Sequence, residues 1–411
     1  MHILFVQPTA DKRGHYGIYT THVCQELTRH GGADLTLFTN KIYPEKYLNE
    51  KPLFKIFEFK KGKYAFERFD HLKKKLPFLY LYGYLRNSFV AIREAIKYLK
   101  KHKFDIVFVM DTEYGILSLL LKLFGKKNPP LVLMVQAANF SFKKFSGNVF
   151  FKIYKTFQRK ILKSAIKKNI KAFLVLGEFH KEELQKQLKL NKDFPIRVIY
   201  DGADPPQEFL DKKTAREKLE INYDKPLFLF FGMLRKDKGI EYLLEAVSLL
   251  KKEAFKLIIA GSLFDYKEND IRSLIKKLDI EEKIILRLGY VEDKKVPWYF
   301  FSSDAVIFPY CKIYTGGSGP LLKEAAIFGT PVIASDVSEM GRLVKKYKMG
   351  LVAKPENPED LSRQIINFLH LSQEQKQQFA DNARKVANTW PKMANDYYDF
   401  FKSILDSHEI H

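Results

Sequence analysis

Short apolar runs alternate with amphipathic patterns of helical period along the whole chain. In the first half, the apolar runs predict strands at positions 2–7, 35–39, 105–110, 131–136, 172–176 and 196–200. The helical patterns between them lie at 17–30, 85–102, 113–123, 147–169 and 178–188. Apolar strands that alternate with helices are typical of parallel sheets covered by helices. The pattern therefore predicts an α/β architecture for this half.

The second half repeats the alternation. Its predicted strands lie at 227–231, 256–260, 284–288, 305–308, 331–334 and 350–353. Its predicted helices lie at 239–251, 268–278, 319–328, 339–346 and 358–368, and a helical tail follows at 372–405. Pro205 and Pro206 can continue neither a helix nor a central strand, so we place the interdomain linker there. We expect two Rossmann-like domains, 1–204 and 205–387.

Charge is distributed unevenly over the 411 residues, whose formal net charge is +22. Positions 1–203 hold 38 Lys/Arg and 17 Asp/Glu residues, whereas positions 204–411 hold 32 and 31. Such asymmetry indicates an anionic partner for the first half only. Cys24 and Cys311 fall in different predicted domains, which favours a reducing compartment. No apolar run is long enough to span a bilayer, and residues 1–8 are predicted to form a strand rather than a signal peptide.

Two segments of the second half carry the chemistry of phosphate binding. The strand 226–231 is followed by Gly232, Arg235 and Lys238, a small residue and two cations placed where a strand gives way to a helix. A glycine-rich turn, 315–319, opens onto a helical run that carries Glu324. Fixed cations and a helix N-terminus can bind phosphates, and a carboxylate can accept hydrogen bonds from ribose hydroxyls. Together these segments indicate a site for a nucleoside diphosphate.

These segments resemble those of the family 4 glycosyltransferases, which have the GT-B fold and are also described as glycosyl transferases group 1. The resemblance covers 232–239, the run from Phe308 to Ser335, and 198–204, which is similar to the loop that closes the family's first domain. It implies two Rossmann-like domains facing each other across a cleft. It also implies that the C-terminal segment 388–411 crosses back to the first domain, although a last helix packed on its own domain is the alternative.

The resemblance also assigns roles to individual residues. Arg235 and Lys238 would stabilise the departing diphosphate without a metal ion or another cofactor, because their donors point to where charge develops. Glu324 would bind the ribose. Family members carry a further glutamate where this chain has Gly316, so backbone N–H groups and hydroxyls would have to hold the sugar. The expected donor-binding set is Gly232, Thr315, Gly316, Gly317, Ser318, Gly319 and Glu324.

The first domain contains weaker candidates for the acceptor side. The loop Gly14, His15, Tyr16 and Gly17 resembles the family's glycine loop after the first strand. Asp111 and Glu113 follow the strand 105–110, and helix N-capping is the alternative role for both. Gln136 stands where relatives often place a histidine, and an amide cannot act as a base. The resemblance implies retention of anomeric configuration, with the donor's own phosphate deprotonating the acceptor.

The basic first half suggests where such an enzyme would act. Segment 55–103 holds 14 basic and 4 acidic residues, and segment 141–171 holds 10 basic and no acidic residues. Helical pattern 147–169 places an apolar face opposite a basic one, which is typical of an interfacial membrane helix; a core helix with a solvated charged face is the alternative. We expect a cytoplasmic, peripheral membrane enzyme that transfers a sugar from a nucleotide sugar to a glycan or lipid-linked acceptor.

Three other functions are also compatible with the sequence. A nucleotide-sugar epimerase or a soluble-glucan synthase would share the diphosphate site but would not need a basic first half. A nucleic-acid-binding protein would explain the charge, but no binding module is recognisable and we expect no nucleic acid. An inactive sugar-nucleotide-binding protein is the third, because of Gly316 and Gln136.

Overall fold

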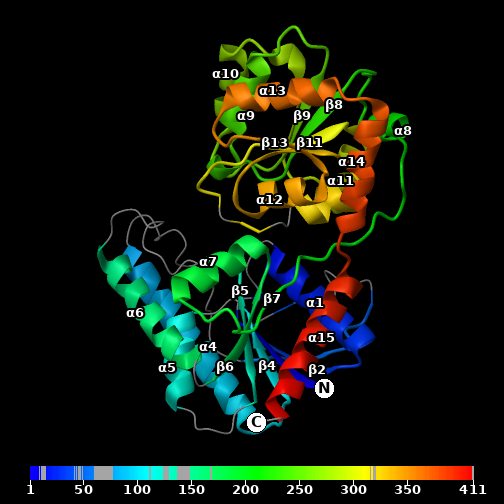
Figure 1. Cartoon of the computed structure of the whole chain (residues 1–411). Helices are drawn as coiled ribbons and strands as arrows, with labels where there is room; N and C mark the ends of the chain where they lie inside the picture. The colour runs from blue at the N-terminus through cyan, green and yellow to red at the C-terminus, as the bar shows by residue number, and fades with distance from the viewer. Residues whose placement is uncertain are drawn as a thin grey trace. The chain divides into compact units, whose positions relative to one another are not determined.

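The computed structural model describes residues 1–8, 10, 15–40, 42, 44, 48, 50–59, 77–110, 113–123, 129–136, 149–166, 169–314, 316–317 and 321–409. The chain divides into two compact units (Figure 1). The first unit comprises Met1–Ile199 together with Trp390–His411, and the second comprises Tyr200–Thr389. Each unit is built around one parallel sheet, as the alternation of apolar runs and helical patterns predicts.

The first unit contains a seven-stranded parallel sheet in the order β3-β2-β1-β4-β5-β6-β7, as far as the described residues extend. Its strands are β1 (His2–Gln7), β2 (Asp34–Thr39), β3 (Lys55–Glu58), β4 (Ile106–Val109), β5 (Leu131–Val135), β6 (Ile170–Val175) and β7 (Ile196–Val198). The order reverses between β1 and β4, so the chain runs outward from the centre of the sheet in both directions. Ligands of such sheets bind at the carboxyl ends of the strands beside this reversal.

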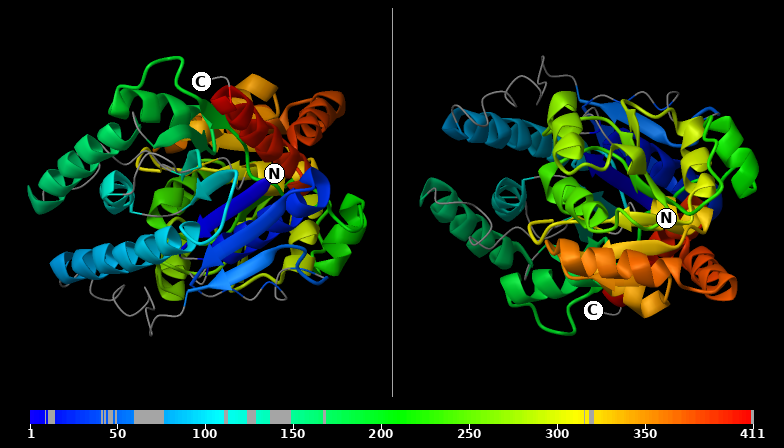
Figure 2. Two further views of the ribbon diagram at one scale, coloured as in Figure 1. Left: turned by 90° about the horizontal axis from the view of Figure 1, so that it is seen from below. Right: turned by 90° about the horizontal axis from the view of Figure 1, so that it is seen from above.

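Helices cover both faces of this sheet (Figure 2). They are α1 (His15–Gly31), α4 (Pro77–Leu99), α5 (Tyr114–Leu123), α6 (Val149–Ile166), α7 (Glu178–Leu188) and α15 (Trp390–Glu409). Ile3 and Phe5 of β1 pack in one core with α1 and α15, whereas Leu4 and Val6 pack in the opposite core with α4 and α5. Alternate side chains of a strand point to opposite faces, so an unbroken apolar run serves both cores.

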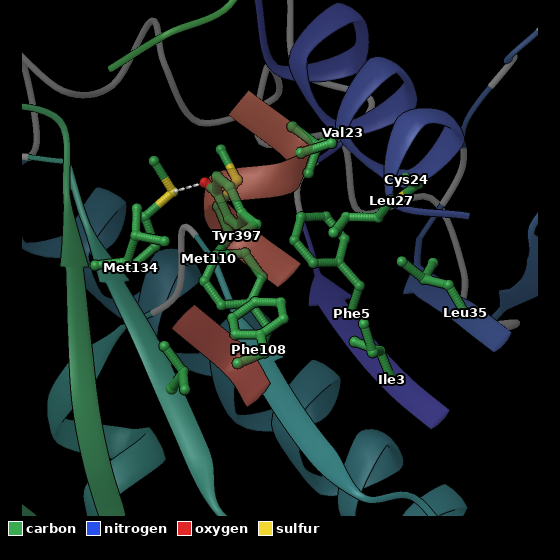
Figure 3. Close-up of a cluster of buried hydrophobic side chains, with 14 of the residues drawn as sticks. Ile3, Phe5, Val23, Cys24, Leu27, Leu35, Phe108, Met110, Met134 and Tyr397 are labelled. Atoms are coloured by element: carbon green, nitrogen blue, oxygen red, sulfur yellow. Dashed lines mark hydrogen bonds between the residues drawn. The ribbon is translucent and has the colours of Figure 1, made fainter. Parts of the chain in front are cut away.

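The last helix returns to the first unit, as the fold implied by the sequence requires. Helix α15 contributes Met393, Tyr397 and Phe401 to the core that contains β1 and β4 (Figure 3). The hydroxyls of Tyr397 and Tyr19 lie 2.6 Å apart, and the Tyr397 hydroxyl also contacts Sδ of Met134 at 3.9 Å. The aromatic side of the tail is therefore buried against α1 and the sheet, and the alternative of a helix packed on the second unit is wrong.

The second unit contains a six-stranded parallel sheet in the order β10-β9-β8-β11-β12-β13. Its strands are β8 (Leu227–Phe231), β9 (Lys256–Gly261), β10 (Ile284–Leu288), β11 (Ala305–Phe308), β12 (Val332–Ser335) and β13 (Gly350–Ala353). Its α-helices are α8 (Lys212–Lys218), α9 (Ile240–Ser248), α10 (Glu268–Lys277), α11 (Val296–Ser302), α12 (Ser338–Tyr347), α13 (Pro358–Leu369) and α14 (Gln373–Val386). The order reverses between β8 and β11, which are hydrogen-bonded neighbours.

Several predicted boundaries need correction. Strand β3 was not predicted: only Ile56 and Phe57 of its four residues are apolar, too short a run to mark a strand, and all four are exposed at the sheet edge. Helix α4 begins at Pro77 rather than at 85, so the aromatic run 78–84, which precedes the predicted start, is helical. The short helices α8 and α11 were also missed, and the predicted helix 319–328 contains a π-helix, Leu321–Ala326. Within the described residues, no helix is both long and apolar enough to cross a membrane.

Candidate active site

The loop after β8 lies against the loops after β9 and β11. A Cβ on Gly261 would lie only 2.0 Å from the carbonyl oxygen of Gly232, and one on Gly239 would lie 2.1 Å from that of Pro309. Both positions therefore require glycine, and both also have a positive φ. Cys311 N donates to the carbonyl of Asp237 at 3.0 Å, which ties the third loop to the first. The segment 232–239 is thus held at the carboxyl ends of the central strands, beside the reversal of strand order.

Arg235 stands in extended conformation at the end of this loop, immediately before a single turn of 3-10 helix, Lys236–Lys238. Its Nε donates to Oδ1 of Asp237 at 2.9 Å, and its Nη2 donates to Oδ2 at 2.8 Å. The guanidinium fork is therefore fixed in orientation while its side chain remains 37% exposed. A fixed and accessible guanidinium is suited to bidentate phosphate binding.

Lys238 is buried beside the same loop. Its Nζ lies 5.5 Å from the ring centroid of Tyr310 and 2.9 Å from the place where a Cβ on Gly232 would stand. Burial lowers the pKa of Lys238, while the charge of Glu324 raises it and that of Arg235 lowers it further. Burial likewise raises the pKa of Glu324 to about 7, against the opposing charges of Lys238 and Lys323. Lys238 thus lies within electrostatic reach of both Arg235 and Glu324, the other two residues singled out in the sequence.

Two tyrosines line the same region and were not predicted from the sequence. The rings of Tyr310 and Tyr314 lie 4.5 Å apart, and both side chains are buried. The Tyr314 hydroxyl donates to the carbonyl of Gly317 at 3.5 Å, whereas the Tyr310 hydroxyl has no hydrogen-bond partner among the described residues. Nothing in the sequence marks these residues except their position between a strand and the glycine-rich turn.

The glycine-rich turn is described only in part. Gly316 and Gly317 belong to the described residues, and the Ser338 hydroxyl at the start of α12 donates to the carbonyl of Gly316 at 3.1 Å. Thr315, Ser318 and Gly319 lie outside the described residues. Lys323, in the π-helix that follows this turn, has its ammonium 3.9 Å from the carboxylate of Asp201. Asp201 is buried and is not among the site residues predicted from the sequence.

The candidates of the first unit have different surroundings. Glu113 is 1% exposed and accepts hydrogen bonds from the N–H groups of Gly115 and Ile116 at 3.1 and 2.5 Å, and from Tyr154 and Gln158. It therefore caps α5 and joins it to α6, which is the structural alternative considered above. Gln136 follows β5, and its Nε2 is buried without a hydrogen-bond partner among the described residues.

The glycine-loop candidates are described incompletely. His15 and Tyr16 begin α1, but only their backbone is described, and Gly17 is buried in the same turn. Gly14 and Asp111 lie outside the described residues. In the part of the chain that is described, no group of three or more His, Cys, Asp or Glu side chains is arranged to hold a metal ion.

Known families match both halves of the chain. Residues 17–207 match the family described as Glycosyltransferase Family 4, and residues 211–386 match Glycosyl transferases group 1. An uncharacterised glycosyltransferase of Methanocaldococcus jannaschii is 28% identical over 51% of this chain and 55% of its own length. An O-antigen chain mannosyltransferase B of Escherichia coli is 31% identical over 48% of this chain and 51% of its own length. The chain thus spans about half the length of these two relatives.

Solved structures match the whole chain. A glycosyltransferase from Rickettsia africae has a TM-score of 0.70 at 20% identity and covers 98% of both chains. The HepE protein of Anabaena, crystallised with UDP and glucose, has a TM-score of 0.66 at 16% identity and covers 98% of this chain and 100% of its own. Two units with parallel sheets and this likeness to solved structures define the GT-B fold. The first half of the chain thus resembles Glycosyltransferase Family 4, and the second half resembles Glycosyl transferases group 1.

Proposed function

We propose that the protein transfers a sugar from a nucleotide diphosphate donor to a glycan or lipid-linked acceptor. The observation that supports this most directly is the grouping of Arg235, Lys238 and Glu324 at the carboxyl ends of β8 and β11. The guanidinium and the ammonium would bind the diphosphate, and the Glu324 carboxylate would accept hydrogen bonds from the ribose. The second unit would thus hold the donor, and the first would select the acceptor.

In the proposed step, the bond between the anomeric carbon and the diphosphate oxygen breaks as the acceptor oxygen bonds to the same face of that carbon. The acceptor's proton passes to the departing phosphate, and the anomeric configuration is retained. Arg235 and Lys238 would stabilise the negative charge that grows on the leaving group, so the reaction would need no metal ion. Two features support this role: Asp237 holds the guanidinium of Arg235 in place, and the ammonium of Lys238 is buried at the end of the same loop.

We also propose that the first unit docks on an anionic membrane surface. On α6, Ile153 and Phe157 are 63% and 55% exposed, while the buried side of the helix is formed by Gln158, Leu162 and Ala165. The apolar face predicted from the sequence is therefore largely turned outward, next to the exposed Lys160. Exposed apolar side chains among cations are the pattern of a surface that enters the interfacial region of a membrane.

Thermal stability measured with UDP, GDP, ADP and UMP tests the donor assignment. A ligand at a hundred times its dissociation constant stabilises the folded state by about 2.7 kcal/mol. We expect one diphosphate to raise the melting temperature, UMP to have a smaller effect, and Arg235→Ala to abolish the response. The exposed Lys236 provides the matched control, because Lys236→Ala should respond like the wild type. If no nucleotide stabilises the wild type, the donor assignment is wrong.

A further inference from the structure

The side chain of Tyr314 occupies the space beside Gly316. A Cβ added to Gly316 would lie 2.3 Å from the Tyr314 hydroxyl oxygen and 2.5 Å from Cζ of the same ring. Real Cβ atoms do not approach other atoms so closely, and the hydrogen bond from Ser338 to the Gly316 carbonyl holds the turn in place. Position 316 can therefore carry a side chain only if Tyr314 moves.

The Tyr314 hydroxyl can form a further hydrogen bond, beyond the one it makes within the protein. Its side chain is 7% exposed, and its only hydrogen bond among the described residues is the 3.5 Å contact with the Gly317 carbonyl. Buried hydroxyls normally have closer partners, since an unpaired polar group is costly. The adjacent Tyr310 hydroxyl is buried and has no hydrogen-bond partner within the described part of the chain. Among the described residues, these two buried phenols therefore make one hydrogen bond in all, the long contact with Gly317.

The charges around Tyr314 place it near the residues assigned to the donor. Burial raises the pKa of Tyr314; the charge of Arg235 lowers it, and those of Asp237, Glu324 and Asp201 raise it. The phenol therefore stays neutral at physiological pH and lies within reach of both the phosphate-binding cation and the ribose-binding carboxylate. The parts of a nucleotide sugar that remain are the base and the transferred sugar. The sugar is bonded directly to the diphosphate, whereas the base is separated from it by the ribose, so a group beside the phosphate-binding cation is better placed for the sugar.

We propose that Tyr314 determines donor specificity by hydrogen bonding a hydroxyl of the transferred sugar, and that Gly316 is glycine because Tyr314 fills its side-chain space. This inference rests on the proposed function. A phenol can both donate and accept a hydrogen bond, so it suits a neutral sugar bearing a free hydroxyl near the anomeric carbon. Tyr314, two residues before Gly316, thereby supplies the polar group that residue 316 lacks.

Calorimetric titration with matched ligand pairs tests the proposal. The pairs are UDP with UDP-glucose, GDP with GDP-mannose, and ADP with ADP-glucose. For the pair that binds, Tyr314→Phe should weaken the affinity for the nucleotide sugar about five- to tenfold. The affinity for the free diphosphate should stay within about twofold of the wild-type value. Tyr347→Phe, on α12 of the same unit, is the control and should change neither affinity.

The possible outcomes separate the two proposals. If the wild type binds none of the diphosphates, the donor assignment fails and this inference falls with it. If the wild type binds a diphosphate but Tyr314→Phe weakens both members of the pair equally, or neither, the donor assignment stands and the sugar contact is refuted.

A double-mutant cycle tests the steric part independently of any ligand. Gly316→Ala should lower the melting temperature of the wild type, because the new methyl group must displace the Tyr314 ring. In the Tyr314→Ala background the same substitution should have little effect, since the space is then empty. An equal loss in both backgrounds would show that Tyr314 does not exclude a side chain at 316.

Discussion

The guanidinium of Arg235 is held at two points by the carboxylate of Asp237, with N···O distances of 2.9 and 2.8 Å. A lysine cannot keep both contacts and still present a donor to phosphate, because it has one nitrogen in place of a planar fork. We therefore expect Arg235→Lys to lower kcat on the order of a hundredfold, close to the effect of losing one such donor completely. Steady-state kinetics with the donor identified by thermal shift would measure this. Full activity in Arg235→Lys would show that only charge is needed.

Gly232 keeps the space around the Lys238 ammonium open. Gly232 has a φ of +105°, and a Cβ there would lie 2.9 Å from Nζ of Lys238. We expect Gly232→Ala to weaken diphosphate binding about tenfold by moving the ammonium, in addition to a strain of about 1 kcal/mol. Gly289→Ala is the control, since its φ is +126° and nothing lies within 4 Å of its Cβ position. Titration calorimetry should show weaker binding for Gly232→Ala alone.

The raised pKa of Glu324, about 7, makes stability depend on pH. The folded protein binds this proton more tightly than the unfolded chain does, whose carboxyl has a pKa near 4.5. The stabilisation is therefore complete below pH 4.5 and is lost as the pH rises through 7. Between pH 5 and pH 8 the free energy of unfolding of the wild type should fall by about 2 kcal/mol more than that of Glu324→Gln. Thermal melting at both values measures this, with the exposed Glu359→Gln as control.

We expect Glu113 to act through structure rather than through catalysis, because its carboxylate is occupied by hydrogen bonds from α5 and α6. Glu113→Ala removes the cap of α5 and leaves Tyr154 and Gln158 without their shared acceptor. We expect a loss of about 2–3 kcal/mol in stability. Circular dichroism would measure the loss, and Glu178→Ala at the start of α7 should cost much less. A normal melting temperature combined with a large fall in kcat would instead assign Glu113 to the reaction.

The outward-facing apolar pair on α6 predicts membrane binding. Replacing both Ile153 and Phe157 by serine should weaken binding to vesicles of phosphatidylglycerol and phosphatidylcholine by at least about tenfold, because each buried side chain contributes on the order of 1.5 kcal/mol or more. Vesicle sedimentation measures this. Leu249→Ser in the second unit, at a side chain that is 56% exposed, is the matched control. If the wild type does not sediment with anionic vesicles, the membrane proposal is wrong.

Buried strands could be predicted from the sequence because a parallel strand covered on both faces is a continuous apolar run. Strand β4, Ile106–Val109, is buried throughout, and the predicted range 105–110 differs from it by one residue at each end. Strand β3 could not be found, since its residues pair through the backbone at an exposed edge. Pro77 is a residue type that favours the first turn of a helix, yet the aromatic run after it obscured the start of α4.

In the candidate site, too, some features could be predicted from the sequence and others could not. Arg235, Lys238 and Glu324 could be selected because charged residues after a strand and in a helix are visible in the sequence. The contact of Tyr314 with Gly316 could not be predicted, because it depends on the direction of one ring over a neighbouring turn. The pairing of Arg235 with Asp237 depends likewise on the tight turn that brings two residues of one loop together.

The return of α15 has a practical consequence for dividing the protein. Residues 1–199 alone would lack Trp390, Met393, Tyr397 and Phe401, and the matching faces of α1 and β4 would lose their apolar cover. The second unit, Tyr200–Thr389, is one continuous segment and is the natural fragment to express for ligand titration. The first unit should instead be produced as a fusion in which segment 390–409 is rejoined to residue 199 through a flexible linker, so that a single polypeptide again contains the whole core.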